Sequence, residues 1–198
     1  MTELPLFPLS AVLLPHGRMP LRIFEQRYLD LVRDTMRNDS SFGMVWIISG
    51  SEVAQRGQAA PRLGDYGTRA RIVDWDQLPD GLLGVSIEGV QRFELLETET
   101  RANGLVVGSV RDLPAPRTQG MRREWLPMLD VLRSLEAHPH VQRLGLDVDF
   151  NDAWQVAYTL VQVLPIEESL KYKMLGIDQL DDLMGALHAL LNRVSGEE

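Results

Sequence analysis

The sequence contains no cysteine among its 198 residues. Disulfide bonds, thiolate-ligated metal centres and cysteine nucleophiles are therefore excluded. A chain of this length buries roughly 70% of the surface that its unfolded form exposes, so it can build a core without a disulfide or a metal. Because a lack of cysteine fits a reducing compartment, we predict a cytoplasmic location.

Lysine is scarce as well, because Lys171 and Lys173 are the only two in the chain. A phosphate-binding P-loop needs a lysine directly after a glycine, and neither lysine follows one. A Ser–Lys peptidase dyad needs its two side chains in contact. Ser169 and Lys171 are two positions apart on a predicted helix, where side chains point in different directions. We therefore predict that the chain is not an enzyme.

Clusters of metal-ligating residues are equally sparse. His138 and His140 flank a proline, which directs the imidazoles apart, and no third ligand is close in sequence, so we interpret this stretch as a loop. Asp147, Asp149 and Asp152 are spaced as in a calcium loop, but the glycine and the distal glutamate of such a loop are missing. Asp152 is more simply a helix N-cap. The sequence thus predicts neither a metal nor a cofactor.

The chain also lacks an excess of positive charge and a long hydrophobic run. Its formal net charge is −8 and its pI is about 5.0. A protein that binds nucleic acids or anionic membrane surfaces needs a stripe of basic residues, and the acidic net charge of this chain argues against one. The apolar stretch 4–15 contains three prolines and has no basic residue before it, so we expect a strand there and not a signal peptide. We predict no nucleic-acid partner and no membrane partner.

What is present is a change of pattern near residue 117. In residues 1–117, short apolar runs are separated by Gly, Pro, Asp and Ser, which indicates strands. The strands are predicted at 4–9, 21–24, 42–48, 64–75, 82–96 and 105–110, with one helix at 25–37. The prolines place the first strand at an edge or in an irregular position. The buried face of the helix is predicted to carry Tyr28, Leu29, Val32 and Met36.

In residues 118–198 the apolar residues recur at helical spacing. Helices are predicted at 125–135, 153–161, 165–174 and 180–194. The last of these has the clearest apolar stripe, with Leu187 at its centre. The proline-containing segment 113–120 is the predicted joint, so we place the domains at 1–117 and 118–198. The fold class predicted is α+β, a small, partly open β-barrel with one helix followed by a helical bundle.

Several ordered motifs resemble a known family. Residues 4–9, 12–15 and 20–28 resemble the opening signature of the Lon protease N-terminal domain. Residues 64–72 (GDYGTRARI) resemble its G…GT.A.I strand, and residues 89–93 (GVQRF) its G..RF element. The resemblance covers nearly the whole chain. It implies a PUA-like pseudo-barrel followed by a helical bundle, and a role in substrate recognition, with the ATPase and the peptidase located in other domains.

The strand-to-helix corner at 22–28 combines aromatic and charged side chains. The candidate binding residues there are Arg22, Phe24, Glu25, Arg27 and Tyr28. They indicate either a polar rim beside an aromatic contact surface or an ion network that fixes the corner, and we favour the ion network. Arg92, in the GVQRF motif, is a further candidate that we interpret mainly as a brace of the barrel. Trp46 and Trp75 lie on predicted strands, and we place both in the core, with the alternative that one of them lines a groove.

The leading functional prediction is a stand-alone, non-catalytic module that binds protein or peptide segments, including unfolded ones, or a partner protein. The alternative is a module that binds a small ligand or RNA, because PUA-like barrels also occur in RNA-binding proteins. An apolar groove or an open sheet edge favours a peptide, whereas a basic stripe favours RNA.

Overall fold

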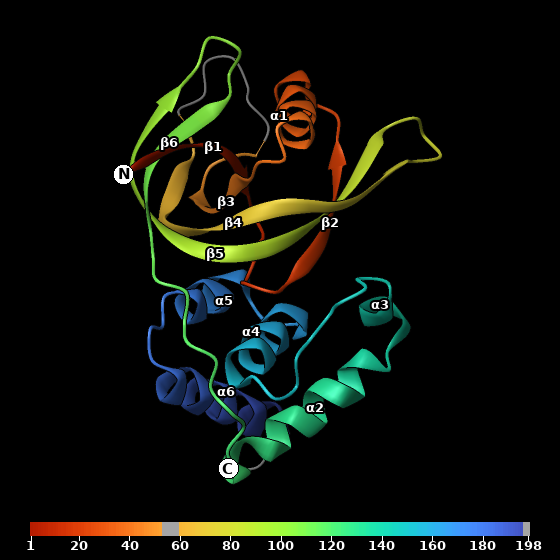
Figure 1. Ribbon diagram of the computed structural model, residues 1–198, viewed down its shortest axis with the longest axis vertical. Helices are drawn as coiled ribbons and strands as arrows, with labels where there is room; N and C mark the ends of the chain where they lie inside the picture. Colours follow the sequence, from red (N-terminus) through yellow and green to blue (C-terminus); the bar gives the residue numbers. More distant parts are fainter. Residues whose placement is uncertain (53–59, 196–198) are drawn as a thin grey trace. The chain divides into compact units, whose positions relative to one another are not determined.

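The computed structural model describes residues 1–52 and 60–195 and divides the chain into two compact units, Met1–Ala115 and Pro116–Glu198. The first unit is a β pseudo-barrel with one helix, and the second unit is a helical bundle (Figure 1). The predicted α+β fold class is therefore confirmed. No helix among the described residues is both long and apolar enough to cross a membrane.

Outside residues 53–59, the barrel unit is built from six strands and one helix. They are β1 Thr2–Leu9, β2 Arg18–Ile23, α1 Gln26–Arg37, β3 Phe42–Ser49, β4 Arg62–Gln77, β5 Leu83–Thr100 and β6 Val106–Asp112. The hydrogen-bonded order is β2-β5-β4-β3-β1-β6, and β6 also pairs with β5. Five strands therefore close into a ring, and β2 is added beside the first half of β5.

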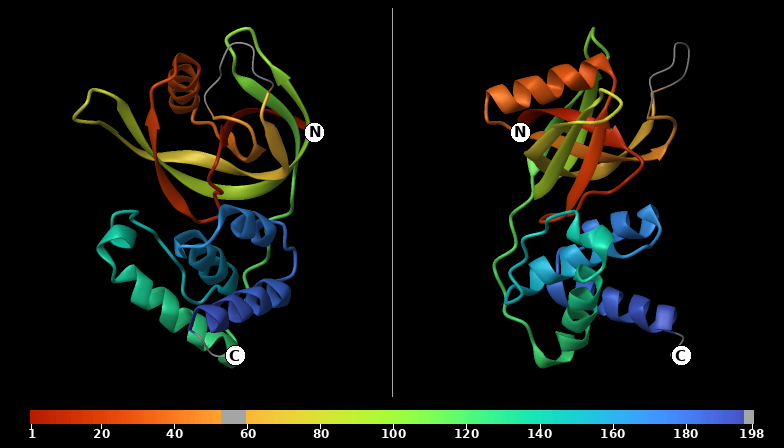
Figure 2. Two further views of the ribbon diagram at one scale, coloured as in Figure 1. Left: turned by 180° about the vertical axis from the view of Figure 1, so that it is seen from behind. Right: turned by 90° about the vertical axis from the view of Figure 1, so that its right-hand side faces the viewer.

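The strands β4 and β5 are longer than the ring requires. The pairing of β3 with β4 ends at Ala70, whereas β4 and β5 stay paired up to Gln77 and Leu83. Beyond the ring the two strands form a three-stranded ribbon with β2, which pairs with residues 83–88 on the other side of β5 (Figures 1 and 2). A turn closes this ribbon, with Gly81 at φ 82° and the Leu78 amide donating to the Leu82 carbonyl at 2.8 Å. Pro79, Asp80 and Gly81 are residue types that favour such a turn.

Strand β1 is one of the five strands that form the ring, and it lies between β3 and β6. Residues 2–5 pair with β6, and residues 6–9 pair in parallel with β3. Each half of β1 is therefore hydrogen-bonded on one side only, which accommodates Pro5 and Pro8 because proline cannot donate to a second neighbour. The sequence predicted either an edge or an irregular position for this strand, and the structure shows the irregular one.

Helix α1 supplies Tyr28, Leu31 and Val32 to the main barrel core. Met36, predicted on this face, is instead 44% exposed. The helix buries positions 28, 31, 32 and 35, so its buried face is centred one residue away from the predicted one. Leu29 lies at the border of that face and is only partly buried.

Two glycines of the family-like motifs lie where a side chain has no room. A Cβ atom on Gly67 would lie 2.4 Å from the Met44 carbonyl oxygen, and one on Gly89 would lie 2.1 Å from the Leu14 carbonyl oxygen. In the second case the 12–17 segment crosses β5 at that point, and the His16 amide donates to the Gly89 carbonyl at 2.8 Å. The glycines therefore mark close approaches of backbone to backbone.

In its described part, up to residue 195, the helical unit contains a 3₁₀ turn and five helices. They are Arg123–Trp125, α2 Leu126–Glu136, α3 Pro139–Gln142, α4 Ala153–Val163, α5 Glu168–Leu175 and α6 Leu180–Ser195. Helix α4 contacts α2, α5 and α6. The prediction of a loop at 138–140 is wrong, because Pro139 begins the short helix α3 and the His138 ring nitrogen accepts from the His140 amide at 3.2 Å. Leu187, at the centre of the α6 stripe, is fully buried.

Asp152 begins α4 as the predicted N-cap. Its carboxylate accepts a hydrogen bond from the Trp154 amide at 3.1 Å and another from the Gln119 amide at 3.4 Å. The Ala153 amide donates to the Gln119 carbonyl at 2.7 Å. One carboxylate thus caps a helix and attaches the segment that enters the helical unit.

Candidate functional site, a groove on the barrel unit

An apolar groove of about 280 Å³ lies on the barrel unit beside the start of α1. Its walls come from the end of β1, from the middle of β2 and from the corner that joins β2 to α1. The lining residues are Phe7, Pro8, Leu9, Pro20, Leu21, Arg22, Phe24, Glu25, Tyr28 and Glu52. The groove therefore joins three segments that are distant in sequence, namely residues 7–9, residues 20–28 and Glu52.

Phe24 is the exposed aromatic side chain of this groove, at 58% exposure. The alternation of strand β2 buries Leu21 and Ile23 and turns Arg22 outward, and Phe24 follows on the outward side. Glu25 is the N-cap position of α1, so the chain turns directly after Phe24. The local geometry thus presents a large apolar ring to solvent next to a hollow, which is the arrangement of a contact residue.

The floor of the groove is a pair of stacked rings. Tyr28 is buried and stacks on Phe7, with the ring centroids 4.1 Å apart. Burial raises the pKa of the Tyr28 hydroxyl to about 12, with Glu25 and Glu52 adding to this shift and Arg27 opposing it. The hydroxyl therefore stays neutral across the physiological pH range, which suits a floor that contacts apolar groups.

Arg27 holds the corner together from behind the lining. Its guanidinium pairs with Glu25 at 2.9 Å, donates to the Gly104 carbonyl at 2.8 Å and lies 4.5 Å from the centre of the Tyr28 ring. It also donates to the Glu52 carbonyl at 3.3 Å. These contacts are those of the predicted ion network, and they fix the side of the groove that carries Glu25.

The six candidate residues divide into three sets. Arg22, Phe24, Glu25 and Tyr28 line the groove, and Arg27 braces it. Arg22 does not join the ion network of the corner, because it pairs with Asp80 in the β4–β5 turn. Arg92 is buried on β5 and is not among the lining residues. The groove also uses Leu9, Pro20 and Glu52, which were not among the candidate residues.

Most charged side chains on the barrel strands are paired with one another. Glu88 bridges Arg18 and Arg71 at 2.7 and 2.6 Å, Arg69 pairs with Asp112 at 2.6 Å, and Arg111 pairs with Glu94. Burial alone would raise the pKa of the Glu88 carboxyl, but the hydrogen bonds from the two arginines outweigh burial and lower it. Arg18, Arg69, Arg71 and Arg111 are therefore committed to carboxylates, which makes them less available to phosphates.

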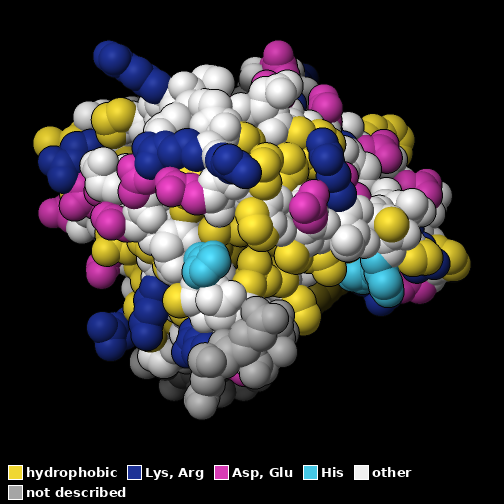
Figure 3. All heavy atoms as spheres, turned by 90° about the horizontal axis from the view of Figure 1, so that it is seen from below, with side chains coloured by type: hydrophobic (Ala, Val, Ile, Leu, Met, Phe, Trp, Pro, Cys, Tyr) yellow, Lys and Arg dark blue, Asp and Glu magenta, His cyan; other side chains and the backbone are white. Residues whose placement is uncertain are grey.

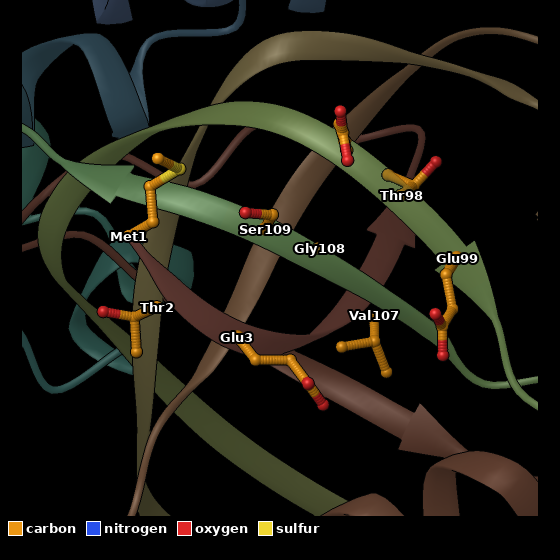
Figure 4. Close-up of a pocket in the computed structure, with 9 residues that line it drawn as sticks. Met1, Thr2, Glu3, Thr98, Glu99, Val107, Gly108 and Ser109 are labelled. Carbon is orange, nitrogen blue, oxygen red and sulfur yellow. The ribbon is translucent and has the colours of Figure 1, made fainter.

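Two further hollows differ from the groove in chemistry. One, of about 240 Å³, lies over β1, β5 and β6 and is lined by short polar and acidic residues, among them Glu3, Glu97 and Glu99 (Figure 4). The other, of about 150 Å³, lies over β2, β4 and β5 beside Trp75. Trp75 is 58% exposed, so its predicted core position is wrong, whereas Trp46 is half-buried and donates to the Ser10 carbonyl at 3.2 Å.

The helical unit exposes apolar surface too. Leu126 at the start of α2 is among its exposed large side chains. Figure 3 shows hydrophobic side chains gathered across the middle of the face that it views, with charged side chains around them. Within the described residues no group of three or more His, Asp or Glu side chains is placed to hold a metal ion.

Comparisons with known proteins agree with one another. A family model described as the ATP-dependent protease La (LON) substrate-binding domain matches residues 3–193. The chain is 35% identical to the Lon N-terminal domain protein from Xanthomonas campestris, with a TM-score of 0.75 over 96% of this chain and 98% of that one. The N-terminal domain of Mycobacterium avium complex Lon protease shares the fold, at 12% identity and a TM-score of 0.63 over 94% and 96% of the two chains.

A curated relative shows how the lengths compare. The chain is 22% identical to the Lon protease of Buchnera aphidicola over 193 residues, which is 95% of this chain and 24% of that protein. The chain therefore spans about a quarter of the length of this relative.

Proposed function

Because this chain belongs to the ATP-dependent protease La (LON) substrate-binding domain family, we propose that it recognises protein segments through the groove around Phe24. The observation that carries the proposal is the groove itself, which places an exposed aromatic ring beside an apolar hollow of about 280 Å³. An apolar side chain of a bound segment would contact Phe24, Leu9 and Pro20 above the Tyr28–Phe7 stack. Burial of such a side chain contributes about 1.5 to 3 kcal/mol.

The rim of the groove would then orient the segment. Arg22 on one side and Glu25 on the other offer a donor and an acceptor to the backbone or to polar side chains. Both are already engaged in ion pairs, so they can bind without bringing an unpaired charge into the interface. This supports recognition of apolar segments of varied sequence over recognition of a single motif.

We further infer that the chain contributes recognition and not catalysis. The Lys171 ammonium donates to the Gln162 carbonyl at 3.1 Å and pairs with Glu168 at 3.2 Å, while Ser169 is exposed on the same helix. These contacts direct the Lys171 ammonium to Gln162 and Glu168, which does not favour a dyad with Ser169. The family description, a substrate-binding domain, supports the same inference.

We also propose that the partner is a protein segment and not a nucleic acid or a membrane. Arg18, Arg69 and Arg71 on the barrel strands are paired with carboxylates, and the net charge of the chain is −8. The cytoplasm remains the location that we predict from the lack of cysteine.

A binding titration with a matched variant tests the proposal. We expect labelled β-casein, an unfolded polypeptide, to bind the chain, and Phe24→Ala to weaken binding by about tenfold, since aromatic anchors contribute more than 1 kcal/mol. Val90→Ala is the control, because Val90 is also exposed on the barrel unit but does not line the groove. Fluorescence anisotropy gives the affinities, and thermal melting verifies that both variants fold.

Two results would count against the proposal. Equal affinities of Phe24→Ala and the unchanged chain would show that the groove is not the binding surface. Strong binding of a labelled RNA that falls steeply between 50 and 200 mM salt, as phosphate contacts do, would favour the RNA-binding alternative.

A further inference from the structure

The second half of β4 has one unpaired edge. The pairing of β3 with β4 ends at Phe42 and Ala70, while β5 stays paired with β4 up to Gln77. Among the described residues no strand pairs with the other side of residues 71–77. This edge belongs to the ribbon that extends beyond the ring (Figures 1 and 2). Such an edge offers backbone donors and acceptors to an additional strand.

The local hydrogen bonding agrees with an open edge. The Trp75 amide donates to the carboxylate of its neighbour Asp74 at 2.9 Å. An amide that faced β5 would donate to a β5 carbonyl, so this amide points to the unpaired side. The ladder also shifts its register between Ile72 and Asp74, and a shift of this kind with acidic neighbours is how proteins protect an edge against non-specific pairing.

The side chains of this edge carry an apolar group and uncompensated negative charge. Trp75 is 58% exposed and lines the hollow of about 150 Å³ together with Pro20 and Leu78. Asp74 and Asp76 flank it, and neither has a cationic partner within residues 1–52 and 60–195. Their isolation contrasts with the paired carboxylates Glu88, Glu94 and Asp112 on the same sheet.

Strand geometry then defines the chemistry of a partner. Successive residues of a strand point to opposite faces, so Asp74 and Asp76 share one face and Trp75 lies on the other. A strand added beside residues 71–77 would place alternate side chains opposite these two kinds of residue. Opposite charges and aromatic pairs across neighbouring strands are favourable, whereas like charges directly opposite are not.

We propose that residues 71–77 of β4 bind an extended protein segment by strand addition, and that this segment alternates Lys or Arg with apolar or aromatic residues. The basic side chains pair with Asp74 and Asp76, and the apolar ones cover Trp75. The backbone of the segment continues the β5–β4 sheet. The Asp74 carboxylate has to release the Trp75 amide when the segment binds, so the edge stays protected until a matching segment arrives. This surface borders the groove around Phe24 at Pro20 and Arg22, but Phe24 does not line it, and Asp74, Trp75 and Asp76 do not line the groove.

Three peptides test the proposal on the full chain. The first is a labelled twelve-residue peptide in which lysine alternates with valine and tyrosine. The second replaces each lysine with glutamate, and the third repeats the first with alternate backbone amides N-methylated. We expect the first peptide to bind at least about tenfold tighter than the other two, because one lacks the opposite charge and the other lacks backbone donors. Amide signals of residues 71–77 should shift in NMR spectra only with the first peptide.

Variants separate this edge from its surroundings. Trp75→Ala, and Asp74→Asn combined with Asp76→Asn, should each weaken the first peptide by about tenfold. The matched control is Glu97→Gln combined with Glu99→Gln, because these exposed acidic residues have the same spacing on β5, but β6 occupies their edge. The control should bind the first peptide as the unchanged chain does, and so should Phe24→Ala.

Two outcomes would overturn the proposal. If the N-methylated peptide binds as well as the first peptide, strand addition is wrong. If the glutamine control weakens binding as much as the asparagine pair, the attraction is only that of an acidic molecule for a basic peptide. If the basic peptide does not bind residues 71–77 but casein binding still depends on Phe24, only the strand-addition proposal fails. If the peptide binds this edge but casein binding does not depend on Phe24, only the groove proposal fails.

Discussion

At the scale of single residues, Gly89 carries the most restrictive contact of the barrel unit. A Cβ atom there would lie 2.1 Å from the Leu14 carbonyl oxygen, and a backbone oxygen cannot move aside as a flexible side chain can. We expect Gly89→Ala to lower the free energy of unfolding by about 3 kcal/mol, as overpacking of a rigid site does. Gly120→Ala is the control, since a Cβ at Gly120 meets nothing within 4 Å. Urea unfolding curves of both variants measure the difference, and equal stabilities would contradict this account of the motif.

Glu88 makes the stability of the barrel unit dependent on pH. Its folded-state pKa is lowered by hydrogen bonds from Arg71 and Arg18 in spite of burial, so the unfolded chain binds a proton more readily than the folded one. The resulting stabilisation is complete above the ordinary glutamate pKa and is lost as the pH falls through the lower folded value. We expect Glu88→Gln to reduce stability by roughly 2 kcal/mol at pH 7, the scale of hydrogen bonds to a charged group, and by much less at pH 3.

Thermal melting of Glu88→Gln and of the unchanged chain between pH 7 and pH 3 measures this effect. Glu99→Gln serves as the control, because it makes the same change at an exposed position of the same strand. A difference between Glu88→Gln and the unchanged chain that stays constant over the whole pH range would refute the assignment to a charged hydrogen-bonded pair.

At the scale of elements, the start of α4 depends on one carboxylate. Asp152 accepts from the Trp154 amide inside the helix and from the Gln119 amide outside it. We expect Asp152→Ala to cost about 2 kcal/mol, at the upper end for an N-cap, because the buried amides lose their acceptor. Asp147→Ala, an exposed aspartate in the same loop, should change stability by less than about 0.5 kcal/mol. Chemical denaturation compares the two, and similar losses would show that the cap is not the cause.

The apolar stripe of α6 sets the stability of the helical unit. Leu187 is fully buried, so Leu187→Asp places an unpaired carboxylate in the core and should cost about 4 kcal/mol or more. Ala189→Asp, on the exposed side of the same helix, introduces the same group at a position open to water. Circular dichroism melting should separate the two variants by more than 10 °C for a unit of this size, from roughly 4 kcal/mol. An unchanged melting temperature of Leu187→Asp would contradict the role of the stripe.

The sequence predicted elements better than it predicted how they combine. The strands, α1 and the Asp152 cap follow from local patterns of period two, period 3.6 and capping chemistry, which the chain carries in neighbouring residues. Trp75 was placed in the core because a strand usually has a buried face, but β4 extends beyond the ring, where nothing covers that face. Strand length relative to the ring is a property of the whole sheet and leaves no local signal.

The groove, too, was predicted only where its residues are neighbours in the sequence. Its corner residues Phe24, Glu25 and Tyr28 are adjacent in sequence and were recognised as a mixture of aromatic and charged groups. Leu9 and Glu52 reach the groove only through the parallel pairing of β1 with β3, a contact between distant segments that no spacing reveals. Arg92 was included because it lies in a motif, and its buried position shows that the motif serves the barrel.

At the scale of the whole molecule, limited proteolysis can test where the joint between the two units lies. Residues 113–119 lie between β6 and the start of the helical unit and have no regular secondary structure, and Arg117 is exposed. Proteases need about this kind of extended, accessible backbone, whereas strands paired on both sides resist them. We therefore expect limited trypsin digestion to cut early at Arg117 and to give fragments 1–117 and 118–198, identified by mass spectrometry. Arg117→Gln removes the site without touching either core and should suppress both fragments. Early cuts within residues 64–96, with Arg117 intact, would show that the ribbon opens before the joint does and that the domain boundary lies elsewhere.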